Sequence, residues 1–149
     1  KASKLSDIGF VGQPHKINKE LLKWLLQSDL VPVISPIGFD KSFETFNINA
    51  DIMAGSVASN INSERLILLT DVDGVLDKKG NLLTEISLND IKKLIKNGTI
   101  SGGMIPKIET CVNAVREGVK AAVILNGKVP HAILLEIFTE RGVGTLITS

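Results

Sequence analysis

Three short stretches of the chain bring together residue types that could do chemistry on a phosphate. Residues 47–51 read Asn-Ile-Asn-Ala-Asp and place two amides and a carboxylate at the mouth of a predicted helix. Residues 66–76 are an apolar run that leads into two aspartates and a glycine, and in residues 101–107 a lysine follows a Ser-Gly-Gly loop. Acids and a glycine turn after a buried strand are where nucleotide phosphates and their metal ions commonly bind. Together the stretches predict phosphoryl transfer.

Asn47, Asn49 and Asp51 occupy alternate positions in a segment that is predicted to be extended. Side chains two apart share one face of a strand, so all three can point into one cleft. There the amides could donate to a substrate carboxylate, and the carboxylate could hold cations. A purely structural alternative stays open, in which Asp51 caps the helix and the asparagines satisfy backbone groups of a turn.

Asp71, Asp73 and Gly74 allow two further interpretations. A strand followed by Asp-x-Asp-Gly also opens haloacid-dehalogenase-type phosphatases, in which the first aspartate is the nucleophile and the second an acid/base. Those enzymes need a later acidic pair, whereas the strand expected at residues 121–125 runs into Asn126 and a glycine. The other interpretation is a polar turn with no chemical role.

Two basic side chains lie near predicted helix starts, and the residue pattern makes only Lys107 a candidate for contact with a ligand. Glycine allows close approach of the backbone, and Lys107 at the start of a helix could reach a transferring phosphoryl group. The alternative is a solvated lysine on a flexible connection. His131 lies in the first turn of another predicted helix, where a surface or capping role is expected rather than that of a base.

The elements that must position these residues alternate between apolar strands and amphipathic helices. This alternation predicts an α/β fold, a three-layer αβα sandwich around a largely parallel open sheet that is incomplete at its N-terminal side. Helices are expected at residues 19–27, 51–60, 87–97, 106–118 and 130–140. Strands are expected at residues 31–37, 66–69, 121–125 and 144–147, with a short strand or hairpin within 8–17 and a polar connection at 39–46.

Composition indicates an ordinary soluble domain of 149 residues, with 44% hydrophobic residues and a net charge of +1. The balanced charge gives no reason to expect nucleic acid or an anionic membrane as a partner. No apolar run approaches the ~20 residues that a membrane span needs, and residues 1–13 lack a signal-peptide pattern. The only cysteine, Cys111, excludes an internal disulfide and fits a reducing compartment.

The order Asn-x-Asn-x-Asp, strand-Asp-Val-x-Gly-Val-Leu and Gly-Met-Ile-x-Lys resembles the acetylglutamate kinase branch of the amino-acid kinase family. The resemblance extends over residues 8–145, practically the whole chain. It implies phosphorylation of the side-chain carboxylate of N-acetyl-L-glutamate by ATP with Mg²⁺, a step of arginine biosynthesis, in the cytoplasm or a plastid stroma. Within a single unit, residues 1–46 would end a substrate-binding half and residues 47–149 would form a nucleotide-binding half.

The resemblance also assigns roles to residues. Asn47 and Asn49 would bind acetylglutamate, Asp51 would organise the active-site lysines, and Lys107 would stabilise the transition state. The ATP site would be lined by Asp71, Val72, Asp73, Gly74, Val75, Leu76, Thr99, Ile100, Ser101 and Met104, and no residue is assigned as a metal ligand. A glutamate-type carboxyl group, with a pKa of ~4.3, is already an anion at pH 7, so no general base is needed.

Regulation and size follow from the same resemblance. Arginine-inhibited members, typically hexamers, imply an effector site at His131, Glu140 and Gly144, a homo-oligomer (dimer or hexamer) and, in some members, binding of the PII protein. Family enzymes are about twice this long and carry a glycine-rich phosphate loop and another lysine in their first half. The chain is therefore expected to be a fragment with little activity alone. Alternatives are a kinase for aspartate, glutamate or carbamate, or a non-catalytic nucleotide-binding regulatory half.

Overall fold

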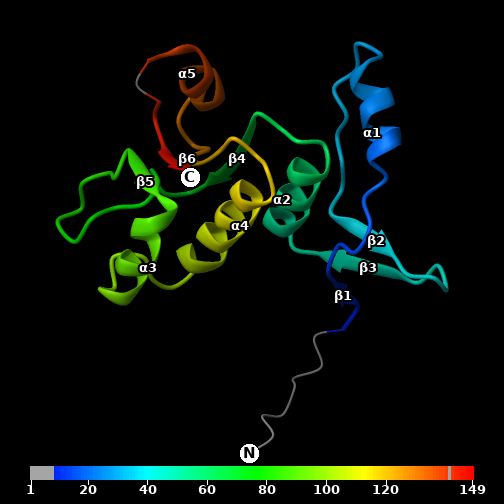
Figure 1. Ribbon diagram of the computed structural model, residues 1–149, viewed down its shortest axis with the longest axis horizontal. Helices are drawn as coiled ribbons and strands as arrows, with labels where there is room; N and C mark the ends of the chain where they lie inside the picture. Colours follow the sequence, from blue (N-terminus) through cyan, green and yellow to red (C-terminus); the bar gives the residue numbers. More distant parts are fainter. Residues whose placement is uncertain (1–8, 141) are drawn as a thin grey trace, which may run out of the picture.

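The computed structural model describes residues 9–140 and 142–149, and in these it contains seven strands and five helices (Figure 1). A three-stranded sheet has the order β1-β3-β2, with β1 at Val11–Gly12, β2 at Ile37–Phe39 and β3 at Thr45–Ile48. A four-stranded sheet has the order β4-β6-β7-β5, with β4 at Arg65–Thr70, β5 at Glu85–Ser87, β6 at Ala121–Asn126 and β7 at Thr145–Thr148. The helices are α1 (Lys19–Leu26), α2 (Ala50–Asn60), α3 (Leu88–Lys96), α4 (Met104–Arg116) and α5 (Ala132–Phe138).

Most of the strand pairs are parallel. Strand β1 runs parallel to β3, β4 to β6 and β5 to β7, whereas the β2–β3 and β6–β7 pairs are antiparallel. The expected α/β class with a largely parallel arrangement is confirmed, and in the described residues the strands fall into two sheets. Helix α2 lies between the two sheets. The four-stranded sheet is on one side of α2, and β1, β2, β3 and α1 are on the opposite side (Figure 1).

Helices cover both faces of the four-stranded sheet. Successive side chains of a strand point to opposite faces, and Leu66, Leu68 and Ile124 point into the large core shared with α2, α3 and α4. Val123 and Leu125 point the other way and pack with Ala132 at the start of α5. The three-layer αβα arrangement is therefore present around this sheet.

Helix α4 is the central helix of the large core. Its buried positions include Ile108, Cys111 and Val115, which recur at the spacing of one helical face. The helix begins at Met104, before the expected start at Pro106, because a proline in the first turn lacks only an N–H that would have no helical partner. It ends before Gly118, whose positive φ of 108° suits the residue that terminates a helix.

The strand expected at residues 31–37 is wrong. Only Ile37–Phe39 is a strand, and Val31 and Val33 are 90% and 95% exposed. Two prolines remove ladder donors from this segment, and no described strand pairs with residues 31–35. The expected polar connection at 39–46 is instead a hairpin turn, in which the Asp40 carboxylate accepts from the N–H groups of Ser42 and Glu44.

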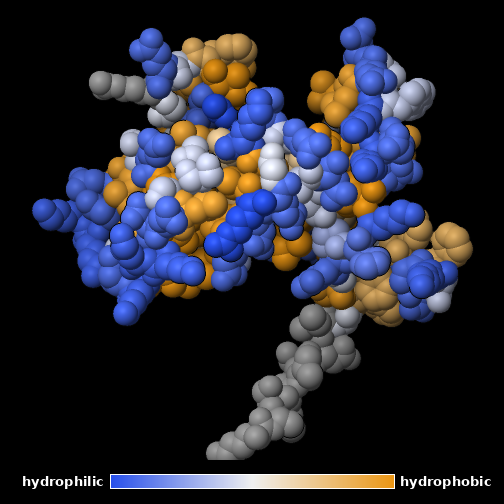
Figure 2. All heavy atoms as spheres, in the orientation of Figure 1, coloured by the Kyte–Doolittle hydropathy of each residue, from blue (hydrophilic) through white to orange (hydrophobic). Residues whose placement is uncertain are grey.

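Large apolar side chains remain exposed around the three-stranded sheet and α1. Phe10, Trp24, Phe39 and Phe43 are each more than half exposed, and apolar surface lies over this part of the molecule (Figure 2). The buried core lies almost entirely in the four-stranded sheet and its helices. Among the described residues, no helix has the length and apolar character to cross a membrane.

Candidate active site

Asn49 starts helix α2. Its side-chain oxygen accepts hydrogen bonds from the backbone N–H groups of Asp51 (3.0 Å) and Ile52 (3.2 Å), the arrangement of an N-cap. The structural alternative therefore describes Asn49 but not Asp51, which is left in the first turn with its carboxylate available for another partner. Asn47 lies on β3 with an exposed side chain, in register with Val11 and Ile37.

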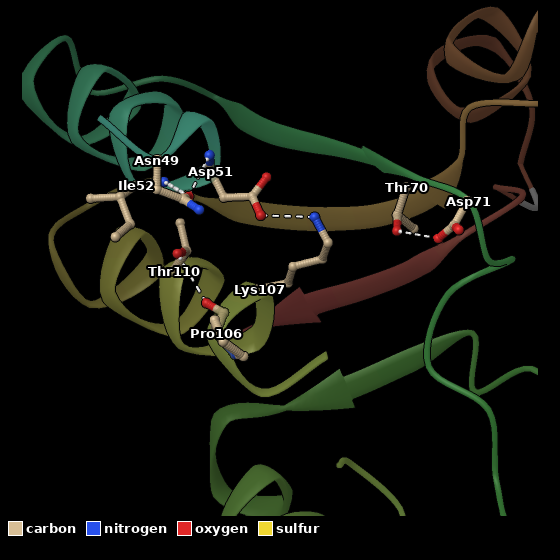
Figure 3. A network of polar contacts seen from close by, with 8 residues as sticks. All are labelled: Asn49, Asp51, Ile52, Thr70, Asp71, Pro106, Lys107 and Thr110. Atoms are coloured by element: carbon tan, nitrogen blue, oxygen red, sulfur yellow. Dashed lines mark hydrogen bonds and ion pairs between the residues drawn. The ribbon is translucent and has the colours of Figure 1, made fainter. Parts of the chain in front are cut away.

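That other partner of Asp51 is Lys107. The lysine Nζ donates to Asp51 Oδ2 at 2.8 Å across 56 residues of sequence, and the two side chains point toward one another from α4 and α2 (Figure 3). Their side chains are only 24% and 25% exposed. Partial burial strengthens the Coulomb attraction relative to an ion pair in open water. Asn49 and Asp51 also line a cavity of about 360 Å³ along the two helices.

Topology explains why these helix starts lie where strands end. Helices α2 and α4 pack against each other and lead through short connections, at residues 61–64 and 117–120, into the parallel strands β4 and β6. A helix that packs on the strand following it runs antiparallel to that strand, so it begins where the strand ends. In Figure 3, Asp51 and Lys107 lie on the side toward which β4 runs to Thr70 and Asp71. This edge is the usual ligand site of an α/β sheet.

Two exposed carboxylates follow β4 at this edge. Asp71 Oδ1 accepts from the Thr70 hydroxyl at 3.4 Å, and Asp73 Oδ1 accepts from Asn126 Nδ2 at 2.8 Å. Asn126 is the last residue of β6, the parallel neighbour of β4. Its role in holding Asp73 was missed from the sequence, where only the polar residue at the end of the next strand gave a signal.

A buried threonine fixes the turn after Asp73. The Val75 N–H donates to Thr145 Oγ1 at 2.9 Å, and Thr145 is fully buried at the start of β7. Gly74 has φ of +145° and lies so close that a Cβ would come within 2.6 Å of Thr145 Oγ1. The turn at Gly74 and Val75 is therefore held against β7. No local pattern in the sequence predicted this contact.

The other residues assigned to ATP differ in exposure. Ile100 is 1% exposed and part of the core, and Met104 packs against that core. Thr99 donates its N–H to Asn97 Oδ1, and the Ser101 carbonyl accepts from Met104. In the described residues, no hydrogen bond or ion pair joins these residues or Asp71 to Lys107. The same part of the chain has no group of three or more His, Cys, Asp or Glu side chains that could hold a metal ion.

Cys111 lies one helical turn after Lys107 and is fully buried. Burial, and then the negative charge of Asp51, raise the pKa of the thiol from 9.0 to about 12, while Lys107 acts in the opposite direction. Lys107 and Cys111 are four residues apart on α4, so the thiol lies on the helix face from which the ion pair extends.

The raised pKa of Cys111 predicts a loss of stability at alkaline pH. Because the folded-state value exceeds the unfolded one, the stabilisation is complete below 9.0 and is lost as the pH rises toward about 12. When the pH is raised from ~8 to ~10, the unfolding free energy of the parent protein should fall by about 1 kcal/mol more than that of a Cys111→Ala variant. Urea unfolding at both pH values measures this, and equal losses in the two proteins would contradict it.

A second cavity, of about 530 Å³, lies beside β5, β7 and α5. Its lining includes Glu85, Glu136, Glu140 and Gly144. Glu136 is 7% exposed; its Oε2 accepts from the Val143 N–H at 2.9 Å, and its Oε1 lies 3.7 Å from Arg65. The structure thus brings together two of the three residues assigned to an effector.

The third, His131, is not in the lining of this cavity. It is the N-cap of α5, with an exposed side chain and a left-handed φ of 59°.

Comparison with known proteins assigns the chain to a family. A sequence profile of the amino acid kinase family matches residues 1–126, and the chain belongs to that family. Because the chain belongs to the amino acid kinase family, the interpretation of Asp71 and Asp73 as phosphatase residues is abandoned.

The particular relatives narrow the class. Acetylglutamate kinase of Bartonella tribocorum is 57% identical over 143 residues, covering 96% of this chain and 48% of that protein. Acetylglutamate kinase of a Bradyrhizobium species is 56% identical over 144 residues, covering 97% and 48%. The resemblance recognised in the sequence is confirmed, and the chain spans about half the length of these curated relatives.

A solved structure shows the same arrangement. The crystal structure of N-acetylglutamate synthase from Neisseria gonorrhoeae, complexed with coenzyme A and L-arginine, superimposes with a TM-score of 0.90. It is 28% identical in sequence, and the match covers 99% of this chain and 34% of the synthase.

Proposed function

We propose that the chain forms part of a kinase that transfers the γ-phosphoryl group of ATP to the side-chain carboxylate of N-acetyl-L-glutamate. The observation that carries the proposal is the Lys107–Asp51 ion pair of 2.8 Å at the edge where β4 and β6 end. The 57% identity to a kinase of that name supports the choice of acceptor. A cytoplasmic location is part of the same proposal.

The chemistry requires positioning and positive charge rather than a base. A carboxylate oxygen attacks the γ-phosphorus, the bond from phosphorus to the ADP oxygen breaks, and an acyl phosphate and ADP result. Both reactants are anions, so Lys107 would neutralise charge on the transferring group. Asp51, held against Lys107 Nζ, would fix the direction of that ammonium group. Asn47 and Asn49 would bind acetylglutamate.

The nucleotide would lie over the loop at residues 71–76, with contributions from residues 99–101 and Met104. Asp71 and Asp73 present exposed oxygens, the ligand type that Mg²⁺ prefers. The described residues contain no cluster of three or more acidic, histidine or cysteine side chains for a metal. These residues fit a magnesium ion bound mainly through nucleotide phosphates, where it would neutralise phosphate charge.

The test is a comparison of acceptors in the complete gene product that contains this chain. ADP formation is measured with N-acetyl-L-glutamate, aspartate, glutamate and carbamate. The proposal expects turnover with N-acetyl-L-glutamate to exceed that with each other acid by at least about 100-fold, the size of discrimination that a site built to hydrogen-bond one substrate readily reaches. Preference for another acid would favour a different amino-acid kinase, and nucleotide binding without turnover would favour a regulatory half.

We also propose that arginine binds the cavity beside β5, β7 and α5. Its lining carries Glu85 and Glu140, both exposed carboxylates suited to a guanidinium group. The gonococcal synthase with a similar fold was crystallised with L-arginine, which supports this choice of ligand.

Glu140→Gln should raise the arginine concentration for half-inhibition of the complete gene product by about tenfold, because a charge-assisted hydrogen bond is lost. Glu20→Gln on α1 is the control and should leave inhibition unchanged. If arginine inhibits the Glu140→Gln and Glu20→Gln variants equally, Glu140 does not contact arginine. If arginine inhibits a His131→Ala variant as it does the parent, His131 does not contact arginine.

A further inference from the structure

Helices α2 and α4 cross at a contact between Gly55 and Thr110. A Cβ built on Gly55 would lie 2.8 Å from Thr110 Cγ2, well inside the distance of an ordinary carbon–carbon contact. Gly55 is not among the residues with positive φ, so its backbone does not require glycine. What requires glycine is the separation of the two helices, which depends on the side chains at their contact.

This crossing lies one helical turn from the ion pair on both helices. Asp51 precedes Gly55 by one turn and Lys107 precedes Thr110 by one turn, so each pair of residues shares a helix face. The orientation of Thr110 is fixed, because its hydroxyl donates to the Pro106 carbonyl at 3.1 Å (Figure 3). Its methyl group faces Gly55. The separation of α2 and α4 at this crossing therefore also determines how far apart Asp51 and Lys107 lie.

We propose that Gly55 and Thr110 are positioning residues, whose contact sets the separation of α2 and α4 at which Asp51 holds Lys107. The expected effect of this contact on kcat rests on the proposed function, whereas its effect on the Asp51–Lys107 ion pair does not. A methyl group added at Gly55 must push the helices apart, because the atom it meets belongs to a hydrogen-bonded side chain inside the packed pair. A shift of about 1 Å at a group that contacts the reacting atoms can cost about 100-fold in rate.

The kinetic test uses Gly55→Ala in the complete gene product. We expect kcat to fall about tenfold or more, and by more than KM for ATP or for acetylglutamate rises, because the displaced Lys107 is needed mainly in the transition state. Thr110→Ser removes the methyl group that meets the new Cβ and keeps the hydroxyl that bonds to Pro106. The double variant Gly55→Ala/Thr110→Ser should therefore recover kcat to within about threefold of the parent.

Ser56→Ala is the matched control for an alanine substitution in α2 and should leave kcat unchanged. An unaltered kcat in folded Gly55→Ala, or a double variant no more active than Gly55→Ala, would overturn the proposal.

A second readout separates this proposal from the proposed function. The coupling between Asp51 and Lys107 is measured by a double-mutant cycle of Asp51→Ala and Lys107→Ala on the unfolding equilibrium in urea. In the Gly55→Ala background the coupling should fall by at least about half, and Thr110→Ser should restore it.

Overall stability alone would not serve as a readout, because alanine also has the higher helix propensity. This coupling pattern in a protein without kinase activity would retain the positioning role and contradict the proposed function. A kinase in which the coupling is unaffected by Gly55→Ala would contradict the positioning role alone.

Discussion

Lys107→Ala should lower kcat of the complete gene product about 100- to 1000-fold, the loss seen when one preorganised charge-stabilising donor is removed from an active site. Lys107 is the cation held by Asp51, and its Nζ lies 2.8 Å from that carboxylate at the strand edge. KM for ATP should change far less than kcat, because the developing charge exists only in the transition state. Steady-state ADP release measures both constants.

Lys120→Ala is the control for this substitution. Lys120 also forms an ion pair, with Glu64 at 2.6 Å, but the side chain is 70% exposed and lies in the connection between α4 and β6. Removing an exposed pair of this kind changes stability little, and kcat should stay within about twofold. A Lys107→Ala enzyme as active as Lys120→Ala would refute the role given to Lys107.

Gly74→Ala should lower the unfolding free energy of the complete gene product by about 3 kcal/mol, combining backbone strain with overpacking. Its φ is +145°, and a Cβ would lie 2.6 Å from Thr145 Oγ1 and 2.8 Å from Leu82 Cδ1. The same intrusion disturbs the bond from Val75 to Thr145, so KM for ATP should rise as well. Urea denaturation and initial-rate kinetics measure the two effects.

Gly80→Ala separates the two causes. Gly80 also has a positive φ, of 86°, but nothing lies within 4 Å of the position of its Cβ. This variant should therefore show only the backbone cost, about 1 kcal/mol, with KM for ATP unchanged. If both substitutions destabilise the protein equally, the close packing of Gly74 against Thr145 contributes nothing and the explanation is wrong.

Elements with complete local signals were predicted well. Helix α3 begins after Ser87, whose hydroxyl donates to the Asp90 carboxylate and accepts no backbone N–H. It ends at Lys96, and its C-cap Asn97 precedes a glycine with positive φ. These signals lie within a few residues of the boundary they mark, so the sequence displays them directly. Residues 31–37 had the β-branched composition of a strand but lacked a described partner for most of their length, and strand propensity acts only through pairing.

The candidate site was predictable in its parts and not in its contacts. Residue type and order singled out Asp51, Lys107 and Asp73, and the structure places the first two in direct contact. The contacts of Asp73 with Asn126, of Val75 with Thr145, and of Gly55 with Thr110 each join residues more than fifty positions apart. Such contacts depend on how helices and strands pack, and a single residue carries no local mark of them.

The most direct measurement is a crystal structure of the complete gene product with a non-hydrolysable ATP analogue and N-acetyl-L-glutamate. The proposed mechanism expects Lys107 Nζ within hydrogen-bond distance, about 3.2 Å or less, of the γ-phosphoryl group while still bound to Asp51. Both substrates bound with Lys107 directed away from the phosphoryl group, or bound at a different edge of the sheet, would contradict it.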